Sequence, residues 1–256
     1  MIQIEPIKAF NDNYIWLVQT NEGVLVIDPG DSDPVIKYLT ERNLNLDAIL
    51  ITHHHFDHTG GIEELVKKYS IKNIYGPHNC SVHITDALKE GFTIKVIGLD
   101  FNIIEVPGHT LDHIAFYLEY EGGSYLFCGD TIFSAGCGKV FEGTFSQMHD
   151  SLQKLAQLPD STKIYCAHEY TLSNLAFAKL AEPNNKKITD RENEVKNLLK
   201  NGLPSLPSTL KNEKEFNPFL RCAEKDMINS LTNKHNLTNT DPVNIFSKLR
   251  QWKDSL

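Results

Sequence analysis

Residues 47–61 read DAILITHHHFDHTGG, an apolar run followed at once by four histidines and an aspartate. The apolar part predicts a buried strand, and the polar part then lies at the carboxyl end of that strand, where loops build sites. His53 and His55 are two residues apart, so in extended backbone both imidazoles face one side and can chelate one ion. Asp57 and His58 follow on the turn and can reach a second ion nearby.

The sequence indicates the roles of three further polar residues less directly. We expect His54 to point away from its two neighbours, as a packing or surface residue rather than a ligand. His113 is either a hydrogen-bond partner of a ligand or a buried structural histidine. Asp28 ends an apolar strand before a Pro-Gly pair and could orient a ligand imidazole through its free N–H group.

More donors follow the ends of later apolar strands. His109 comes after Val-Pro-Gly, Asp130 after Phe-Cys-Gly, and His168 after a run ending in Cys-Ala. Glycine before two of them permits tight turns that bring the backbone close to a site. Imidazole and carboxylate donors suit zinc, iron or manganese, and a donor set without cysteine argues against a structural zinc site.

Strand patterns with a few helices fill the chain up to residue 170, and helices dominate after it. Strands are predicted at 1–10, 13–19, 24–28, 47–52, 71–75, 93–97, 101–106, 114–120, 124–128 and 163–167. Helices are predicted at 34–42, 61–69, 147–158, 172–181, 191–201, and from an Asp241 cap with Pro242 in the first turn. Residues 203–218 are expected to be irregular. The pattern indicates a sheet sandwich flanked by helices, with a domain boundary near residue 172.

Composition and charge exclude several classes of protein. The net charge of −8 argues against a nucleic-acid partner, because phosphate binding needs clustered Lys and Arg. Residues 1–170 hold 11 Lys and Arg against 23 Asp and Glu, whereas residues 171–256 hold 14 against 10. The acidic part suits cations and the basic part an anionic small molecule. The sequence lacks an apolar run long enough for a membrane span and a signal pattern, so we expect a cytoplasmic protein. Five scattered cysteines are expected to be reduced thiols.

The spacing His-x-His-x-Asp-His, then Gly-His, Gly-Asp-Thr and a last His, resembles the metallo-β-lactamase superfamily of binuclear hydrolases. The local sequences look like one branch of it, the glyoxalase II family of hydroxyacylglutathione hydrolases. The resemblance lies in residues 52–61, 107–110, 129–131, 136–139, 141–144, 168–171, 207–210, 217–219 and Arg250-x-x-Lys253. It therefore extends over nearly the whole chain.

This resemblance implies an α+β fold, an αββα metallo-β-lactamase-like sandwich followed by a C-terminal all-helical domain. Residues 1–172 would form the catalytic domain and residues 173–256 the helical glutathione-recognition domain. The first metal would be held by His53, His55 and His109 and the second by Asp57, His58 and His168. Asp130 would bridge both ions, and Asp57 and Asp130 would also be catalytic.

The resemblance also implies an activity. The enzyme would split S-D-lactoylglutathione, or another S-2-hydroxyacylglutathione, into the hydroxy acid and glutathione, the second step of methylglyoxal detoxification. A hydroxide bridging two divalent ions, zinc or else iron or manganese, would attack the thioester. The family's substrate-binding positions correspond here to Lys139, Phe141, Tyr170, Arg250 and Lys253. Phe141 stands where some members have tyrosine, so a hydroxyl group is missing there. We expect a monomer without nucleic-acid or membrane partners.

Four other functions compete with this prediction. A generic lactonase or β-lactamase-like hydrolase would not explain Arg250, Lys253 and the loop of Lys139. A mononuclear iron persulfide dioxygenase would not need Asp57 and His58. A nuclease is disfavoured by the acidic surface, and a non-enzymatic metal-binding module would be excluded by turnover of a thioester.

Overall fold

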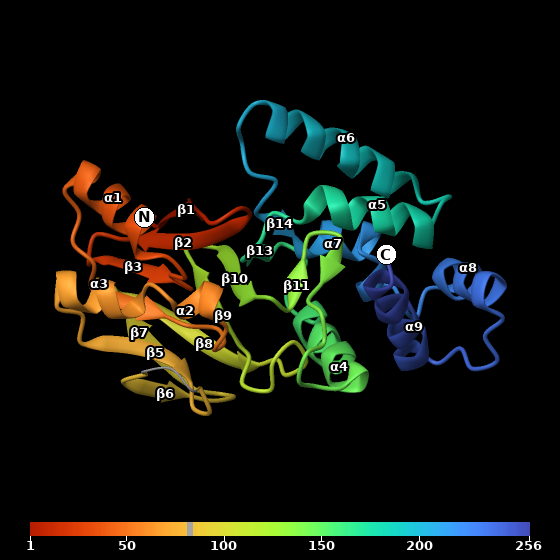
Figure 1. Cartoon of the computed structure of the whole chain (residues 1–256), viewed down its shortest axis with the longest axis horizontal. Helices are drawn as coiled ribbons and strands as arrows, with labels where there is room; N and C mark the ends of the chain where they lie inside the picture. The colour runs from red at the N-terminus through yellow and green to blue at the C-terminus, as the bar shows by residue number, and fades with distance from the viewer. Residues whose placement is uncertain (81–83) are drawn as a thin grey trace.

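The structure is a computed structural model that describes residues 1–80 and 84–256. Two sheets pack face to face in its N-terminal part (Figure 1). The first sheet has the order β1 (Gln3–Ala9), β2 (Asn13–Gln19), β3 (Val24–Ile27), β4 (Ala48–Leu50), β5 (Asn73–Pro77), β6 (Asp86–Leu88). The second has the order β14 (Ser208–Thr209), β13 (Lys163–Cys166), β10 (Gly123–Gly129), β9 (Ile114–Tyr120), β8 (Leu99–Glu105), β7 (Thr93–Val96).

Strand β2 shows why the first sheet is covered on both faces. Because side chains alternate along a strand, Trp16 and Val18 face the second sheet, while Ile15 and Leu17 face the other way. The latter pair belongs to a separate buried cluster with residues of α1 (Ser32–Arg42) and α3 (Ile62–Tyr69). The two helices therefore cover the outer face of the first sheet.

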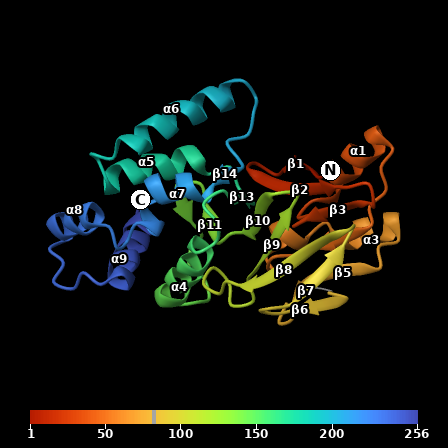
Figure 2. The same cartoon turned by 180° about the vertical axis from the view of Figure 1, so that it is seen from behind.

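The C-terminal region consists mainly of helices. Its elements are α5 (Thr171–Ala181), α6 (Lys186–Lys200), α7 (Leu210–Phe216), the 3₁₀ turn η1 (Pro218–Leu220), α8 (Lys225–His235) and α9 (Pro242–Asp254). Helix α6 lies along α5 in both views (Figures 1 and 2). Helix α4 (Phe145–Ala156) contacts α9 and η1 and so joins this region to the sandwich.

The predicted sandwich flanked by helices is confirmed, and β1 and α9 lie where expected. The Asp241 side chain caps α9 by accepting from the Asn244 N–H group. Two expectations were wrong. Helix α6 begins at Lys186, not near residue 191, because Asn185 caps it and Ile188 extends its buried face. Residues 203–218 are not wholly irregular, since they contain β14 and α7.

The division at residue 172 falls at the start of α5, and it stays a prediction. Strand β14 comes later in the chain yet pairs with β13, so the second sheet takes one strand from the C-terminal region. The 11-residue helix α8 was not predicted, and neither were five short elements: α2 (Phe56–Thr59), β6, β11 (Ile132–Phe133), β12 (Gly136–Cys137) and η1. These five are too short for a periodic pattern to indicate them.

Four cysteines, Cys128, Cys137, Cys166 and Cys222, are buried thiols without a disulfide bond. Burial raises the pKa of Cys128 to about 12, so its thiol is a core side chain rather than a nucleophile. Among the described residues, every helix is too short or too polar to cross a bilayer.

Candidate metal centre

All seven predicted donors meet at one end of the sandwich. His53 and His55 follow β4, and Asp57 and His58 lie on α2. His109 lies on the loop between β8 and β9, Asp130 follows β10, and His168 follows β13. The donors therefore come from both sheets, and the packing of the sheets brings them together.

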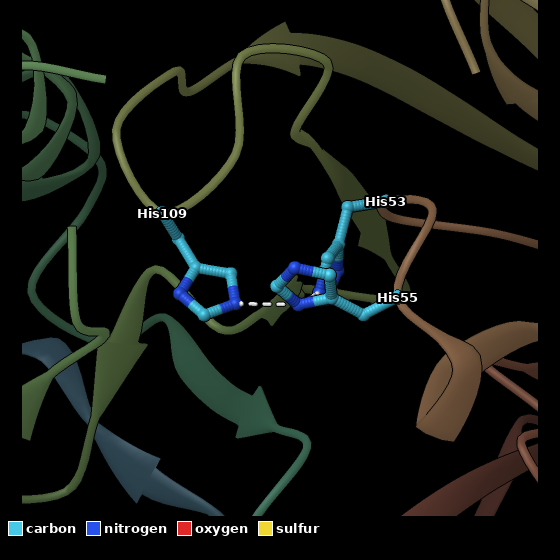
Figure 3. A group of neighbouring side chains, drawn as sticks. All are labelled: His53, His55 and His109. Atoms are coloured by element: carbon cyan, nitrogen blue, oxygen red, sulfur yellow. Dashed lines mark hydrogen bonds between the residues drawn. The ribbon is translucent and has the colours of Figure 1, made fainter. Parts of the chain in front are cut away.

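The first donor group consists of His53, His55 and His109, which point toward one another from two separate segments (Figure 3). The Nδ1 atom of His55 lies 3.2 Å from Nε2 of His53 and 3.1 Å from Nε2 of His109. The second donor group consists of Asp57, His58 and His168. The Oδ2 atom of Asp57 lies 3.4 Å from Nε2 of both of its histidines.

Asp130 faces both donor groups with different oxygens. Its Oδ2 atom lies 3.4 Å from Nε2 of His109, in the first group. Its Oδ1 atom lies 3.4 Å from Nε2 of His168 and 3.5 Å from Nε2 of His58, in the second. One carboxylate thus stands between two sets of three donors, an arrangement that could hold divalent cations.

Two atoms at the centre test whether a metal fits. Nε2 of His58 and Oδ1 of Asp130 are buried and have no hydrogen-bond partner within the described residues. A buried polar atom without a partner is costly to the fold. A cation between these atoms would satisfy both, so the residues present fit divalent metal ions.

The first donor group is held by neutral partners. The Nδ1 atom of His109 lies 2.7 Å from the carbonyl oxygen of Lys139, and Nδ1 of His53 lies 3.0 Å from the Thr52 hydroxyl. Burial lowers the pKa of His53, His55 and His109, and neighbouring imidazoles add to this. These rings are therefore neutral, which is the form that binds a metal.

The second donor group is held by carboxylates and an amide. Nδ1 of His168 lies 2.8 Å from Asp12 Oδ1, and Nδ1 of His58 lies 3.1 Å from Asp28 Oδ2. The Asn13 amide donates to Oδ2 of Asp57 at 3.0 Å. The structure thus places Asp28 beside a ligand imidazole, as its position in the sequence suggested. The parts played by Asp12 and Asn13 were missed.

In the second donor group the pKa values of both histidines are raised, whereas those of the first group are lowered. Burial alone would lower the pKa of His168, but Asp130 and Asp57 outweigh it and raise that pKa to about 10. The pKa of His58 is likewise raised, because Asp130 and Asp28 outweigh burial. The same contacts hold the pKa of Asp130 below its usual range although burial opposes this. The carboxylates therefore attract positive charge to this side of the centre.

Two glycines allow the chain to come close to the donors. A side chain at Gly30 would meet the Asp57 carbonyl oxygen at 1.8 Å, and one at Gly138 would meet the Asp130 carbonyl oxygen at 2.0 Å. Neither position could hold another residue without moving a donor. His113 is buried and is also a hydrogen-bond partner of a predicted ligand: its Nε2 accepts from the Asp130 N–H group at 3.1 Å, and its ring stacks on His53.

The predicted substrate-binding residues lie in two places. Phe141 is 59% exposed and its ring lies 5.3 Å from that of His109, while the Lys139 ammonium lies 5.4 Å from the Phe141 ring. The Tyr170 ring stacks on His168, with ring centroids 4.7 Å apart. These three residues border the metal centre.

Arg250 and Lys253 lie deeper, on α9. Arg250 is buried, donates to the carbonyl oxygen of Cys137 at 3.0 Å and pairs with Asp254 at 2.9 Å. Lys253 donates to the side chain of Asn174, and burial together with Arg250 lowers the pKa of Lys253 to about 8. In this structure Arg250 therefore supports the loop that leads to Lys139.

A cavity of about 990 Å³ lies in the helical region, between α5, α6, α7 and α8. None of the predicted donors or substrate-binding residues lines it. The seven convergent donors mark the candidate site, because they indicate a function more specifically than a cavity without reactive groups does.

Family models match both parts of the chain. Residues 10–168 match the metallo-β-lactamase superfamily, and residues 169–256 match the hydroxyacylglutathione hydrolase C-terminus. A hydroxyacylglutathione hydrolase from Aeromonas hydrophila is 51% identical over 257 residues, covering 99% of each chain. One from Photobacterium profundum is 48% identical and covers 100% of each chain.

Solved structures share the fold at lower identity. ETHE1 from Myxococcus xanthus has a TM-score of 0.65 at 23% identity, covering 100% of this chain and 99% of that one. TTHA1623 in a di-iron-bound form has a TM-score of 0.55 at 26% identity, covering 64% of this chain and 91% of that one. The likeness to ETHE1 shows a common fold. The likeness to TTHA1623 shows that a protein of similar fold binds two iron ions.

Proposed function

We propose that two divalent ions, held by the two donor groups, carry out the reaction of this protein. The chain belongs to the hydroxyacylglutathione hydrolase family of the metallo-β-lactamase superfamily and hydrolyses glutathione thioesters. His53, His55 and His109 would hold one ion, and Asp57, His58 and His168 the other. The position of Asp130 carries this proposal, because its two oxygens face the two groups separately. The donor types suit zinc, iron or manganese.

Divalent ions held by these donors would supply hydroxide near neutral pH and would polarise a substrate carbonyl. The side chains fix where this happens. Asp130 lies between the two groups, and its backbone N–H group donates to His113. Asp57 is partly exposed, and the Asn13 amide holds its Oδ2 atom, so this carboxylate is positioned to bind an ion.

The leaving group needs little help. A glutathione thiolate has a conjugate acid with a pKa of about 8.5, by analogy with free cysteine, and it departs without a strong general acid. The reaction then ends with a 2-hydroxy acid such as D-lactate and with glutathione.

Lys139 is the residue that links the metal centre to the substrate. Its carbonyl oxygen orients His109, and its ammonium lies beside the exposed Phe141 ring. A glutathione thioester carries two carboxylates and one ammonium, so a lysine at this border would attract it. We propose that Lys139, Phe141 and Tyr170 receive the thioester end of glutathione, with Arg250 and Lys253 below them. All donors come from one chain, so a monomer suffices.

A chelator experiment tests the proposal. S-D-lactoylglutathione is offered to the protein as purified, after dialysis against a chelator, and after return of zinc, iron(II) or manganese(II). We expect hydrolysis to be lost on chelation and restored by at least one of these ions, at two ions per chain. Full activity in the metal-free protein would refute the proposal, and activity with one ion per chain would refute its binuclear part.

A further inference from the structure

We propose that His54, Asp112 and Glu142 form a further divalent cation site outside the two donor groups. Ligand atoms of these three residues lie within 4.8 Å of one another. They come from three segments: the loop after β4, the loop between β8 and β9, and the loop before α4. Neither the proposed reaction nor the seven donors uses them, so the proposal stands apart from the function above.

The imidazole of His54 lies between two carboxylates. Its Nδ1 atom is 3.0 Å from Asp112 Oδ1, and its Nε2 atom is 3.2 Å from Glu142 Oε1. His54 is not part of the first donor group, as the alternation of side chains predicted, although its ring packs edge-on against that of His55 with centroids 5.1 Å apart. Two carboxylates and a neutral imidazole carry a net charge of −2, which one divalent cation neutralises.

Asp112 supplies the observation that points to a ligand. Only 5% of its side chain is exposed, and its Oδ1 atom already accepts from the Thr110 hydroxyl at 2.6 Å. Its Oδ2 atom is buried and has no hydrogen-bond partner within the described residues. A buried carboxylate oxygen without a donor needs a cation or a bound water to satisfy it.

The three residues border a cavity. A cavity of about 260 Å³ is lined by His54, Asn79, Leu111, Asp112 and Glu142. Asn79 can add an amide oxygen, and water can complete the coordination. Carboxylate, amide and water donors suit manganese, magnesium or calcium, and of these three ions manganese accepts an imidazole nitrogen most readily. Manganese suits the whole set.

The simpler interpretation is a protonated His54 that donates to both carboxylates. It accounts for the two ring contacts, but it leaves the second oxygen of Asp112 without a partner. A cation that takes one ring nitrogen and Asp112 Oδ2 accounts for all of these atoms. The two interpretations differ in whether the protein binds an extra ion, which can be counted.

Such an ion would connect loops that carry the first donor group. His54 lies between His53 and His55, and Asp112 lies three residues after His109. Glu142 also accepts from the Leu111 N–H group at 2.8 Å. Filling the site would therefore hold these loops together, and we expect the ion of the first donor group to dissociate more slowly.

The test counts manganese ions on the purified enzyme. Protein freed of loosely bound ions by gel filtration is titrated with Mn²⁺ in equilibrium dialysis, and free Mn²⁺ is followed by electron paramagnetic resonance. Wild type is compared with Asp112→Asn and Glu142→Gln. Glu64→Gln, which removes an exposed carboxylate on α3, is the matched control.

We expect wild type and Glu64→Gln to bind one more Mn²⁺ per chain than Asp112→Asn, and Glu142→Gln to bind it at least tenfold more weakly. Equal binding in wild type and Asp112→Asn would overturn the proposal. Circular dichroism checks folding, and the more exposed Glu142→Gln decides if Asp112→Asn does not fold. Thioester hydrolysis by Asp112→Asn separates this result from the proposed function, because Asp112 is neither one of the seven donors nor one of the proposed substrate-binding residues.

Discussion

In the first donor group, Nδ1 of His53 lies beside a hydroxyl and Nδ1 of His109 beside a carbonyl oxygen. In the second group, the Nδ1 atoms of both histidines lie beside the carboxylates of Asp12 and Asp28. The residue types that would bind metal are nearly the same in the two groups. Their surroundings shift the histidine pKa values in opposite directions, down in the first group and up in the second. The pKa values of His168 and His58 are raised mainly by the Asp130 carboxylate, with Asp57 adding at both and Asp28, behind His58, adding at that ring.

A carboxylate behind an imidazole makes the imidazole a stronger donor to a metal. It also adds negative charge that a cation can neutralise. We therefore expect the second donor group to depend on its supporting residues more than the first does. Three sets of substitutions and the pH dependence of KM test this difference between the two groups.

Asp130→Ala should have the largest effect, because it removes the one carboxylate shared by the two groups. We expect both ions to be lost and kcat/KM for S-D-lactoylglutathione to fall on the order of 10³-fold or more. Metal analysis and steady-state kinetics on the same sample measure this. Full metal content in the variant would contradict the bridging position of Asp130.

Asp12→Asn should separate the two halves. The change removes the charge behind His168 but keeps a polar side chain, so we expect affinity for the second ion to fall about 10- to 100-fold. Stepwise metal titration should show the first ion nearly unchanged. Thr52→Val, which removes the hydroxyl beside His53, is the counterpart in the first group, and we expect a smaller loss there. An equal loss in both variants would mean that the charge of the support does not matter.

Arg250→Ala combined with Lys253→Ala should leave both halves of the metal centre intact. We expect KM for lactoylglutathione to rise by about tenfold and kcat to change much less, because these cations would act in binding. Metal content should equal that of wild type. A fall in kcat with unchanged KM would assign Arg250 to support of the loop through Cys137 and not to substrate.

The pH dependence of KM should show the smallest effect. The pKa of Lys253 is lowered to about 8, so the side chain loses its positive charge as pH rises through that value. If the ammonium attracts a substrate carboxylate, KM should rise up to roughly tenfold between about pH 7 and about pH 9. The rise should be absent in Lys253→Ala. An identical profile in that variant would show that another group titrates.

Much of the fold could be read from local patterns. The apolar run before His53 predicted β4, and the Asp-Pro pair at 241–242 predicted the start of α9. Residues 203–218 could not be read in this way, because α7 is short and β14 depends on a partner strand. A strand of two residues has no pattern of its own, so only its hydrogen bonds to β13 define it.

The sequence by itself determined the donors of the candidate site. Side-chain alternation put His53 and His55 on one side and turned His54 away from them, since this follows from backbone geometry within a few residues. Tertiary structure decided what stands behind each donor. Asp12 supports His168 across 156 residues of sequence, and His54 meets Asp112 across 58. Such contacts depend on how the two sheets and their loops pack, which a local pattern does not encode.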